Sequence, residues 1–166
     1  TPIDAPQSVT APNAANTTYT HDDLGRRLAE TSPDRGTTTY THDPAGNVLT
    51  LTDARGATVS YAYDAANRMT SASYSTDPSL TVAYTYDAGT GCTNGVGRLC
   101  QVTDNSGTTN YAYDAYGNVT EHKKTELGVT YRTKYTYDNA NRVLSITYTD
   151  NRVATYTRDI LGRITQ

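Results

Sequence analysis

The chain has 166 residues, a length that suits one domain of ordinary size. Only 36% of its residues are hydrophobic, and Trp and Phe are absent, so fifteen tyrosines supply nearly all of its large side chains. A buried hydroxyl without a partner costs about 1–3 kcal/mol, so this composition argues against an apolar core of packed helices. The net charge of −3 and the absence of Lys or Arg runs argue against a nucleic-acid or anionic-membrane partner, and no stretch is long and apolar enough to span a membrane.

The first segment, residues 1–17, holds three of the six prolines among small and polar residues. This composition fits either a flexible lead-in or linker, or an extended strand along the edge of a sheet. No signal peptide is recognisable, and we expect the chain to be a fragment or a mature product of a longer protein.

An imperfect repeat fills residues 18–166, and its unit is represented by YAYDAANRM at residues 61–69. Each of seven copies has an aspartate with a tyrosine three residues before it, and successive copies are 21 to 27 residues apart. Such a period indicates a repeat architecture. The aspartates are Asp22, Asp43, Asp64, Asp87, Asp114, Asp138 and Asp159, and the tyrosines are Tyr19, Tyr40, Tyr61, Tyr84, Tyr111, Tyr135 and Tyr156.

The residues before each aspartate predict a β-strand, because Thr, Tyr and Val favour strands. Side chains two apart lie on one face of a strand, so each copy places a pair of side chains on the same face. We expect these pairs to line up across strands as an aromatic ladder, worth about 0.2–1 kcal/mol per pair. The second member is a tyrosine in four copies (Tyr63, Tyr86, Tyr113 and Tyr137) and is His21, His42 or Arg158 in the others.

The residues after each aspartate predict a tight turn, because Asp favours its first position and Gly or Asn accepts positive φ at its fourth. The fourth-position residues are Gly25, Gly46, Asn67, Gly117, Asn141 and Gly162, while Asp87 reaches its glycine only at Gly97. A second turn closes most copies. Each copy is therefore a strand, a turn, a strand and a turn, which predicts an all-β fold of about fourteen short strands without significant helix.

An insertion at residues 88–100 expands the fourth turn and carries the only two cysteines, Cys92 and Cys100. They flank a glycine-rich loop whose ends should meet across a hairpin, which favours a disulfide, and two free buried thiols are the alternative. A ring of this size would contribute about 2.5 kcal/mol. A disulfide would indicate an oxidising compartment, whereas two sulfurs without nearby histidine do not predict a zinc site.

The polar residues are explained by structure rather than by catalysis. Each aspartate opens a turn, His21 and His42 replace a strand tyrosine, and no nucleophile motif or metal-binding loop is present. We therefore predict no enzymatic activity, no cofactor and no metal site. The alternative function is carbohydrate binding, because phenol rings bordered by Asp, Asn and Arg are typical of sugar-binding faces.

The repeat YxYDxxGR followed by an apolar residue, as in YAYDAANRM, YAYDAYGNV and YTYDNANRV, resembles the YD repeat of the Rhs family. That family includes shell subunits of insecticidal toxin complexes, bacterial wall-associated proteins and the animal teneurins. The resemblance covers residues 18–166 and implies a β-sheet that spirals into a hollow shell. The family's self-cleaving core segment and toxic C-terminal region have no counterpart here, so the resemblance implies the scaffold alone.

We therefore expect a structural segment of the wall or fibre of a secreted or cell-surface bacterial protein. Open strands at the ends of such a ribbon present unpaired backbone groups, which are templates for strand addition. The expected partners are further YD repeats of the same or neighbouring chains, including a head-to-tail homopolymer, with glycans as the alternative ligand.

Overall fold

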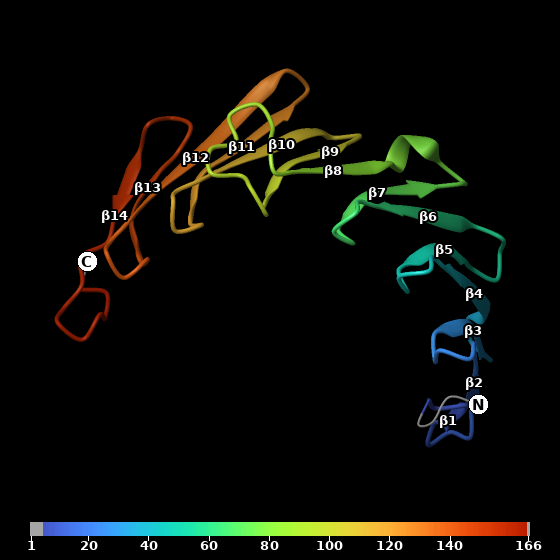
Figure 1. Ribbon diagram of the computed structural model, residues 1–166. Coiled ribbons are helices and arrows are strands. Elements are labelled where there is room, and N and C mark those ends of the chain that lie inside the picture. Colours follow the sequence, from blue (N-terminus) through green and yellow to red (C-terminus); the bar gives the residue numbers. More distant parts are fainter. Residues whose placement is uncertain (1–4, 166) are drawn as a thin grey trace. The chain divides into compact units, whose positions relative to one another are not determined.

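The computed structural model describes residues 5–165, and over this range the predicted all-β fold is confirmed, with fourteen strands and one 3₁₀ turn, η1 (Pro78–Leu80). The chain divides into two compact units between Thr81 and Val82. In each unit the strands form a single layer (Figure 1). The two units are described separately below.

The first unit is a meander of seven strands in which each strand pairs antiparallel with its neighbour along the chain. The strands are β1 (Ser8–Thr10), β2 (Asn16–His21), β3 (Arg27–Ser32), β4 (Gly36–His42), β5 (Val48–Thr52), β6 (Thr58–Tyr63) and β7 (Met69–Tyr74).

The second unit repeats this arrangement with longer strands at its centre and an isolated bridge between Arg158 and Ile164 after its last strand. The strands are β8 (Val82–Tyr86), β9 (Leu99–Asp104), β10 (Gly107–Tyr113), β11 (Val119–Glu126), β12 (Val129–Tyr137), β13 (Val143–Thr147) and β14 (Val153–Thr155).

The lead-in segment contributes β1, which pairs with the first half of β2 through Ser8 opposite Thr18 and Thr10 opposite Asn16. Residues 1–4 of this segment lie outside the described residues. Residues 8–10 of the lead-in therefore form the first strand of this unit.

The sheet encloses almost no core. Within residues 5–165, the buried hydrophobic side chains are Ala72 and Cys100, at 6% and 1% exposure. Exposure instead alternates along the strands: in β4, Tyr40 and His42 are partly covered, while Thr39 and Thr41 on the other face are exposed. Backbone ladders and cross-strand pairs therefore hold the fold, which agrees with a composition unsuited to a packed core.

The hairpins closed by six of the seven YD turns carry a β-bulge. In the β6–β7 hairpin, Tyr63 lies opposite Met69 and Ala62 opposite Ser71, so that Thr70 is an extra residue. A turn closed by a residue of positive φ commonly produces such an offset, and a bulge bends and twists the strand. Five other hairpins have the same shift, and their extra residues are Leu28, Leu49, Cys100, Thr120 and Leu144.

Candidate functional site

The YD turn is a closed hydrogen-bonded unit, and the turn at Asp64 represents it. The backbone N–H of Asp64 donates to the Arg68 carbonyl at 3.0 Å, and the N–H of Asn67 donates to the Asp64 carbonyl at 3.0 Å. The carboxylate accepts the N–H groups of Ala66 and Arg68 at Oδ1 (2.9 and 3.0 Å) and the Arg68 Nε–H at Oδ2 (2.7 Å). Asn67 has φ of 59°, a value that Asn tolerates better than most residues.

The other turns place their residues in the same way. All seven fourth-position residues have positive φ, and the fifth residue returns a side-chain hydrogen bond to the aspartate in the turns of Asp22, Asp43, Asp114, Asp138 and Asp159. In the expanded turn, Asp87 itself has φ of 69° and its Oδ1 accepts the N–H of Gly97 at 2.7 Å.

These hydrogen bonds fix the charge state of the turn aspartates. The backbone N–H of Arg68, followed by its side chain, lowers the pKa of Asp64, and the Asn47 side chain is the largest cause of the lowered pKa of Asp43. A general acid at neutral pH needs a raised pKa and a proton to donate. The lowered pKa values of Asp64 and Asp43 favour the ionised form instead, and these carboxylates use their oxygens to hold their own turns together.

The first tyrosine of each pair faces an intervening strand rather than another tyrosine. Tyr61 lies opposite Ala72, and Tyr135 lies opposite Ile146. Neighbouring strands are about 4.8 Å apart, so tyrosines of successive repeats are about 10 Å apart and too distant for ring contact. The expected aromatic ladder is therefore interrupted in the described strands, and the recorded aromatic pair joins Tyr111 to His122 at 5.4 Å between ring centroids.

The second tyrosine of the pair connects its repeat to the one before. The hydroxyl groups of Tyr63, Tyr113 and Tyr137 donate to the carbonyls of Val48, Leu99 and Val119 at 3.0, 2.6 and 2.7 Å. Each acceptor directly follows the preceding YD turn. The strand register explains why the Val48 carbonyl is available as an acceptor. Along β5, pairing with β6 starts only at Thr50, so the Val48 carbonyl has no ladder partner on the β6 side.

Two replacements of the second tyrosine behave differently. Arg158 preserves the connection, since its Nη2 donates to the Val143 carbonyl at 3.1 Å. His42 does not: its Nδ1 is buried without a hydrogen-bond partner. Sequence reasoning placed these residues on the strand face but missed the hydroxyl bonds. The signal that could have found them is a chain with fifteen tyrosines and no Phe, which indicates that the hydroxyl is required.

The insertion is closed by a disulfide between Cys92 and Cys100, whose Cα atoms are 5.5 Å apart. Cys100 is the extra residue of its bulge. The loop also contacts the end of β10, because the Thr93 hydroxyl and the Asn94 side-chain amide donate to the Tyr113 carbonyl at 3.0 and 2.9 Å. The disulfide therefore holds a loop that takes part in the repeat-to-repeat contacts.

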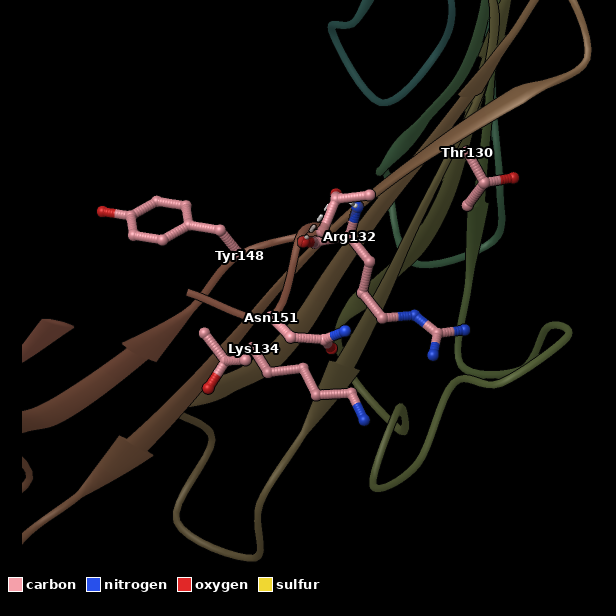
Figure 2. A pocket seen from close by; sticks show the side chains of 7 residues that line it. Thr130, Arg132, Lys134, Tyr148 and Asn151 are labelled. Atoms are coloured by element: carbon pink, nitrogen blue, oxygen red, sulfur yellow. Dashed lines mark hydrogen bonds between the residues drawn. The ribbon is translucent and has the colours of Figure 1, made fainter. Parts of the chain in front are cut away.

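A shallow depression of about 240 Å³ is lined by residues of β12, the end of β13 and the turn between β13 and β14 (Figure 2). The side chains of Arg132 and Lys134 extend in a similar direction in Figure 2, while Tyr148 points away from them. Both cations approach Glu121, at 3.4 Å from Arg132 and 3.9 Å from Lys134. The lining of the depression contains no His, Asp, Cys or Ser. It consists of Thr130, Arg132, Lys134, Thr147, Tyr148, Thr149 and Asn151.

The described residues contain no group of three or more His, Cys, Asp or Glu side chains placed to hold a metal ion. They also include no helix with the length and apolar character needed to cross a membrane.

The sequence matches the RHS repeat family over residues 28–58, 42–77 and 94–130, which together make up more than half of the chain. The chain belongs to the RHS repeat family. The resemblance of the YxYDxxGR motif to the Rhs YD repeat is thereby confirmed. No curated protein sequence matches the chain at a significant level.

The RHS repeat fold of this chain is similar to that of solved toxin-complex structures. A TcdB2-TccC3-TEV structure superposes with a TM-score of 0.71 and 16% identity, over 95% of this chain and 10% of the other. The Photorhabdus luminescens Tc holotoxin pore carrying a TccC3 substitution matches with a TM-score of 0.69 and 20% identity, over 90% and 9%. The chain thus spans about a tenth of the length of these proteins, and the likeness concerns the fold.

Proposed function

We propose that this chain is a non-catalytic structural scaffold, an RHS repeat segment that forms part of a shell wall or fibre. The observation that carries the proposal is that the repeated polar groups are used inside the sheet. The Asp64 carboxylate accepts three hydrogen bonds from its own turn, and the Tyr63 hydroxyl bonds to the preceding repeat. A catalytic site needs groups that are free to meet a substrate.

The structural neighbours support this role. The Photorhabdus luminescens Tc holotoxin pore, which shares the fold, is by name a toxin assembly that contains TccC3, and TccC3 is also part of the TcdB2-TccC3 structure. A wall segment of a secreted or cell-surface bacterial protein would place the sheet in an oxidising compartment, which suits the Cys92–Cys100 disulfide.

Strand edges supply a route to assembly with further repeats. Among the described strands, β1 pairs only with β2, and residues 164–165 pair back onto Thr157 and Arg158. The unpaired edge of β1 and the unpaired edge of residues 164–165 offer backbone N–H and C=O groups to another strand. We propose that further RHS repeats, of the same chain or of neighbouring copies, pair there.

The proposed function is tested by assays of assembly, of catalysis and of glycan binding. Light scattering and electron microscopy at micromolar concentration should show end-to-end assemblies, and a stable monodisperse monomer would exclude self-assembly. A screen of hydrolase substrates should show no turnover, and an activity abolished by a single substitution outside the YD turns would overturn the scaffold role. A glycan array should give no hits, because the hydroxyls of Tyr63, Tyr113 and Tyr137 are already bonded to the backbone.

A further inference from the structure

Successive YD turns contact each other through the fifth residue of each turn, counted from its aspartate. In the first unit, Arg26 Nη1 donates to the Asp43 carbonyl at 2.8 Å, and a Cβ added at Gly46 would lie 3.9 Å from Arg26 Cδ. One turn further on, Asn47 Nδ2 donates to Asn67 Oδ1 at 2.9 Å. An arginine therefore lies beside a glycine, and an asparagine beside an asparagine.

The second unit shows the same pairing independently. A Cβ added at Gly117 would lie 2.7 Å from Arg98 Nη2, so the guanidinium occupies the space that a side chain would need. Asn118 Nδ2 donates to Asn141 Oδ1 at 2.8 Å, which repeats the asparagine pair.

A third arginine–glycine pair follows in this unit, because a Cβ added at Gly162 would lie 2.4 Å from Arg142 Nη1. In the described contacts of both units, a fifth-position arginine lies beside a glycine at the fourth position of the next turn, and a fifth-position asparagine bonds to an asparagine there. In the sequence, the remaining step from Arg68 to Gly97 has the same two residue types.

The physical reason is the reach of the two side chains. Each fifth-position residue is first held by its own turn, as in the 2.9 Å bond from Asn47 Nδ2 to Asp43 Oδ2 or the 2.7 Å bond from Arg142 Nε to Asp138 Oδ2. From that anchor a guanidinium extends over the next turn, and at Gly117 and Gly162 it occupies the space in which a Cβ would lie. An asparagine amide is shorter and reaches only a second side-chain amide.

We propose that the fifth residue of each YD turn is a specificity-determining residue that selects the fourth residue of the next turn, Gly for Arg and Asn for Asn. The turn from Asp159 to Arg163 then presents a docking surface for a YD hairpin whose fourth residue is glycine. Arg163 is anchored by its own turn through a 2.7 Å bond from Nε to Asp159 Oδ2. Its side chain is 74% exposed, against 28% for Arg26, which has a following turn.

A double-mutant cycle in the full chain tests the selection rule. Asn47→Arg alone should lower the folding equilibrium constant on the order of tenfold, because the guanidinium meets the Asn67 side chain. Asn67→Gly alone removes the amide partner. The double variant Asn47→Arg/Asn67→Gly should recover to within about threefold of the parent chain, which is a favourable coupling. Asn118→Arg/Asn141→Gly is the matched cycle in the second unit, and additive effects in both cycles would overturn the rule.

A second experiment tests the docking surface. A copy of residues 51–68 fused after Gln166 continues the repeat in phase, because Ile164 aligns with Val48. Two versions differ only in having Asn or Gly at the fourth position of the added turn. Amide hydrogen exchange should be slower in the added strand of the Gly version, on the order of fivefold, and Arg163→Asn should reverse the preference. Equal protection of the two versions, absence of protection in both, or a preference that Arg163→Asn leaves unchanged would overturn the assignment.

Discussion

The Tyr63 hydroxyl donates a 3.0 Å hydrogen bond to the backbone carbonyl of Val48, fifteen residues earlier in the chain. This carbonyl lies before the point at which the ladder between β5 and β6 starts, so it has no backbone donor from β6. The tyrosine hydroxyl supplies the missing donor. The repeat thus carries its own connection to the repeat before it.

Replacing this tyrosine with phenylalanine should destabilise the sheet without changing its apolar contacts. Tyr63→Phe leaves the Val48 carbonyl without its donor, so we expect the free energy of unfolding to fall by about 1 kcal/mol, and similarly for Tyr137→Phe. Denaturant unfolding measures it. Tyr116→Phe is the control, since Tyr116 is 82% exposed. Equal effects at Tyr63 and Tyr116 would contradict the connecting role.

Acid should destabilise the fold. The pKa values of Asp43, Asp64 and Asp114 are lowered by hydrogen bonds within their turns. An aspartate in the unfolded chain has a pKa of about 3.9, so the unfolded chain takes up protons first as the pH falls. The contribution of these groups is complete above that pH and is lost as the pH falls through the lower folded values. Denaturant midpoints measured from neutral pH downwards should decline below about pH 4.

A variant separates the turn aspartates from the other carboxylates in this acid response. Asp64→Asn cannot titrate at this position, so its midpoint should depend less steeply on pH in the acid range than that of the parent chain. An identical pH profile would show that the turn carboxylates are not the source of acid sensitivity.

Removing the disulfide should loosen the insertion. The double variant Cys92→Ser/Cys100→Ser loses a cross-link with a sequence separation of eight residues, and we expect stability to fall by about 2.5 kcal/mol. Adding a thiol reductant to the parent chain should have a similar effect and should leave the variant unchanged. If reductant shifts both proteins equally, the disulfide is not the cause.

Space at Gly107 should be essential to the hairpin of β10 and β11. A Cβ added there would lie 2.0 Å from the Thr125 carbonyl oxygen, so Gly107→Ala should cost about 3 kcal/mol through strain at a crowded site. Gly56→Ala is the control: Gly56 also has positive φ, at 83°, but a Cβ there would meet nothing within 4 Å. Thermal unfolding of the two variants separates the clash from the cost of the dihedral angle.

The fold was largely predictable from the sequence, because turn chemistry and strand alternation are local properties. Asp64 and Asn67 indicate a turn from residue type alone, and seven copies in phase set the strand order. The connections between repeats were not predictable. The bond from Tyr63 to Val48 depends on where the ladder starts, and the contact of Asn47 with Asn67 depends on the spacing of neighbouring turns. Both follow from register, which the repeat pattern alone does not specify.

The near absence of buried apolar side chains within residues 5–165 affects how such a protein can evolve. Where a central core holds a domain together, inserting or deleting a segment disturbs packing throughout. Here each repeat depends on the repeats beside it, a nearest-neighbour arrangement in which stability is approximately a sum of local terms. Units can then be gained or lost one at a time, provided that the residues meeting at the new junction are compatible.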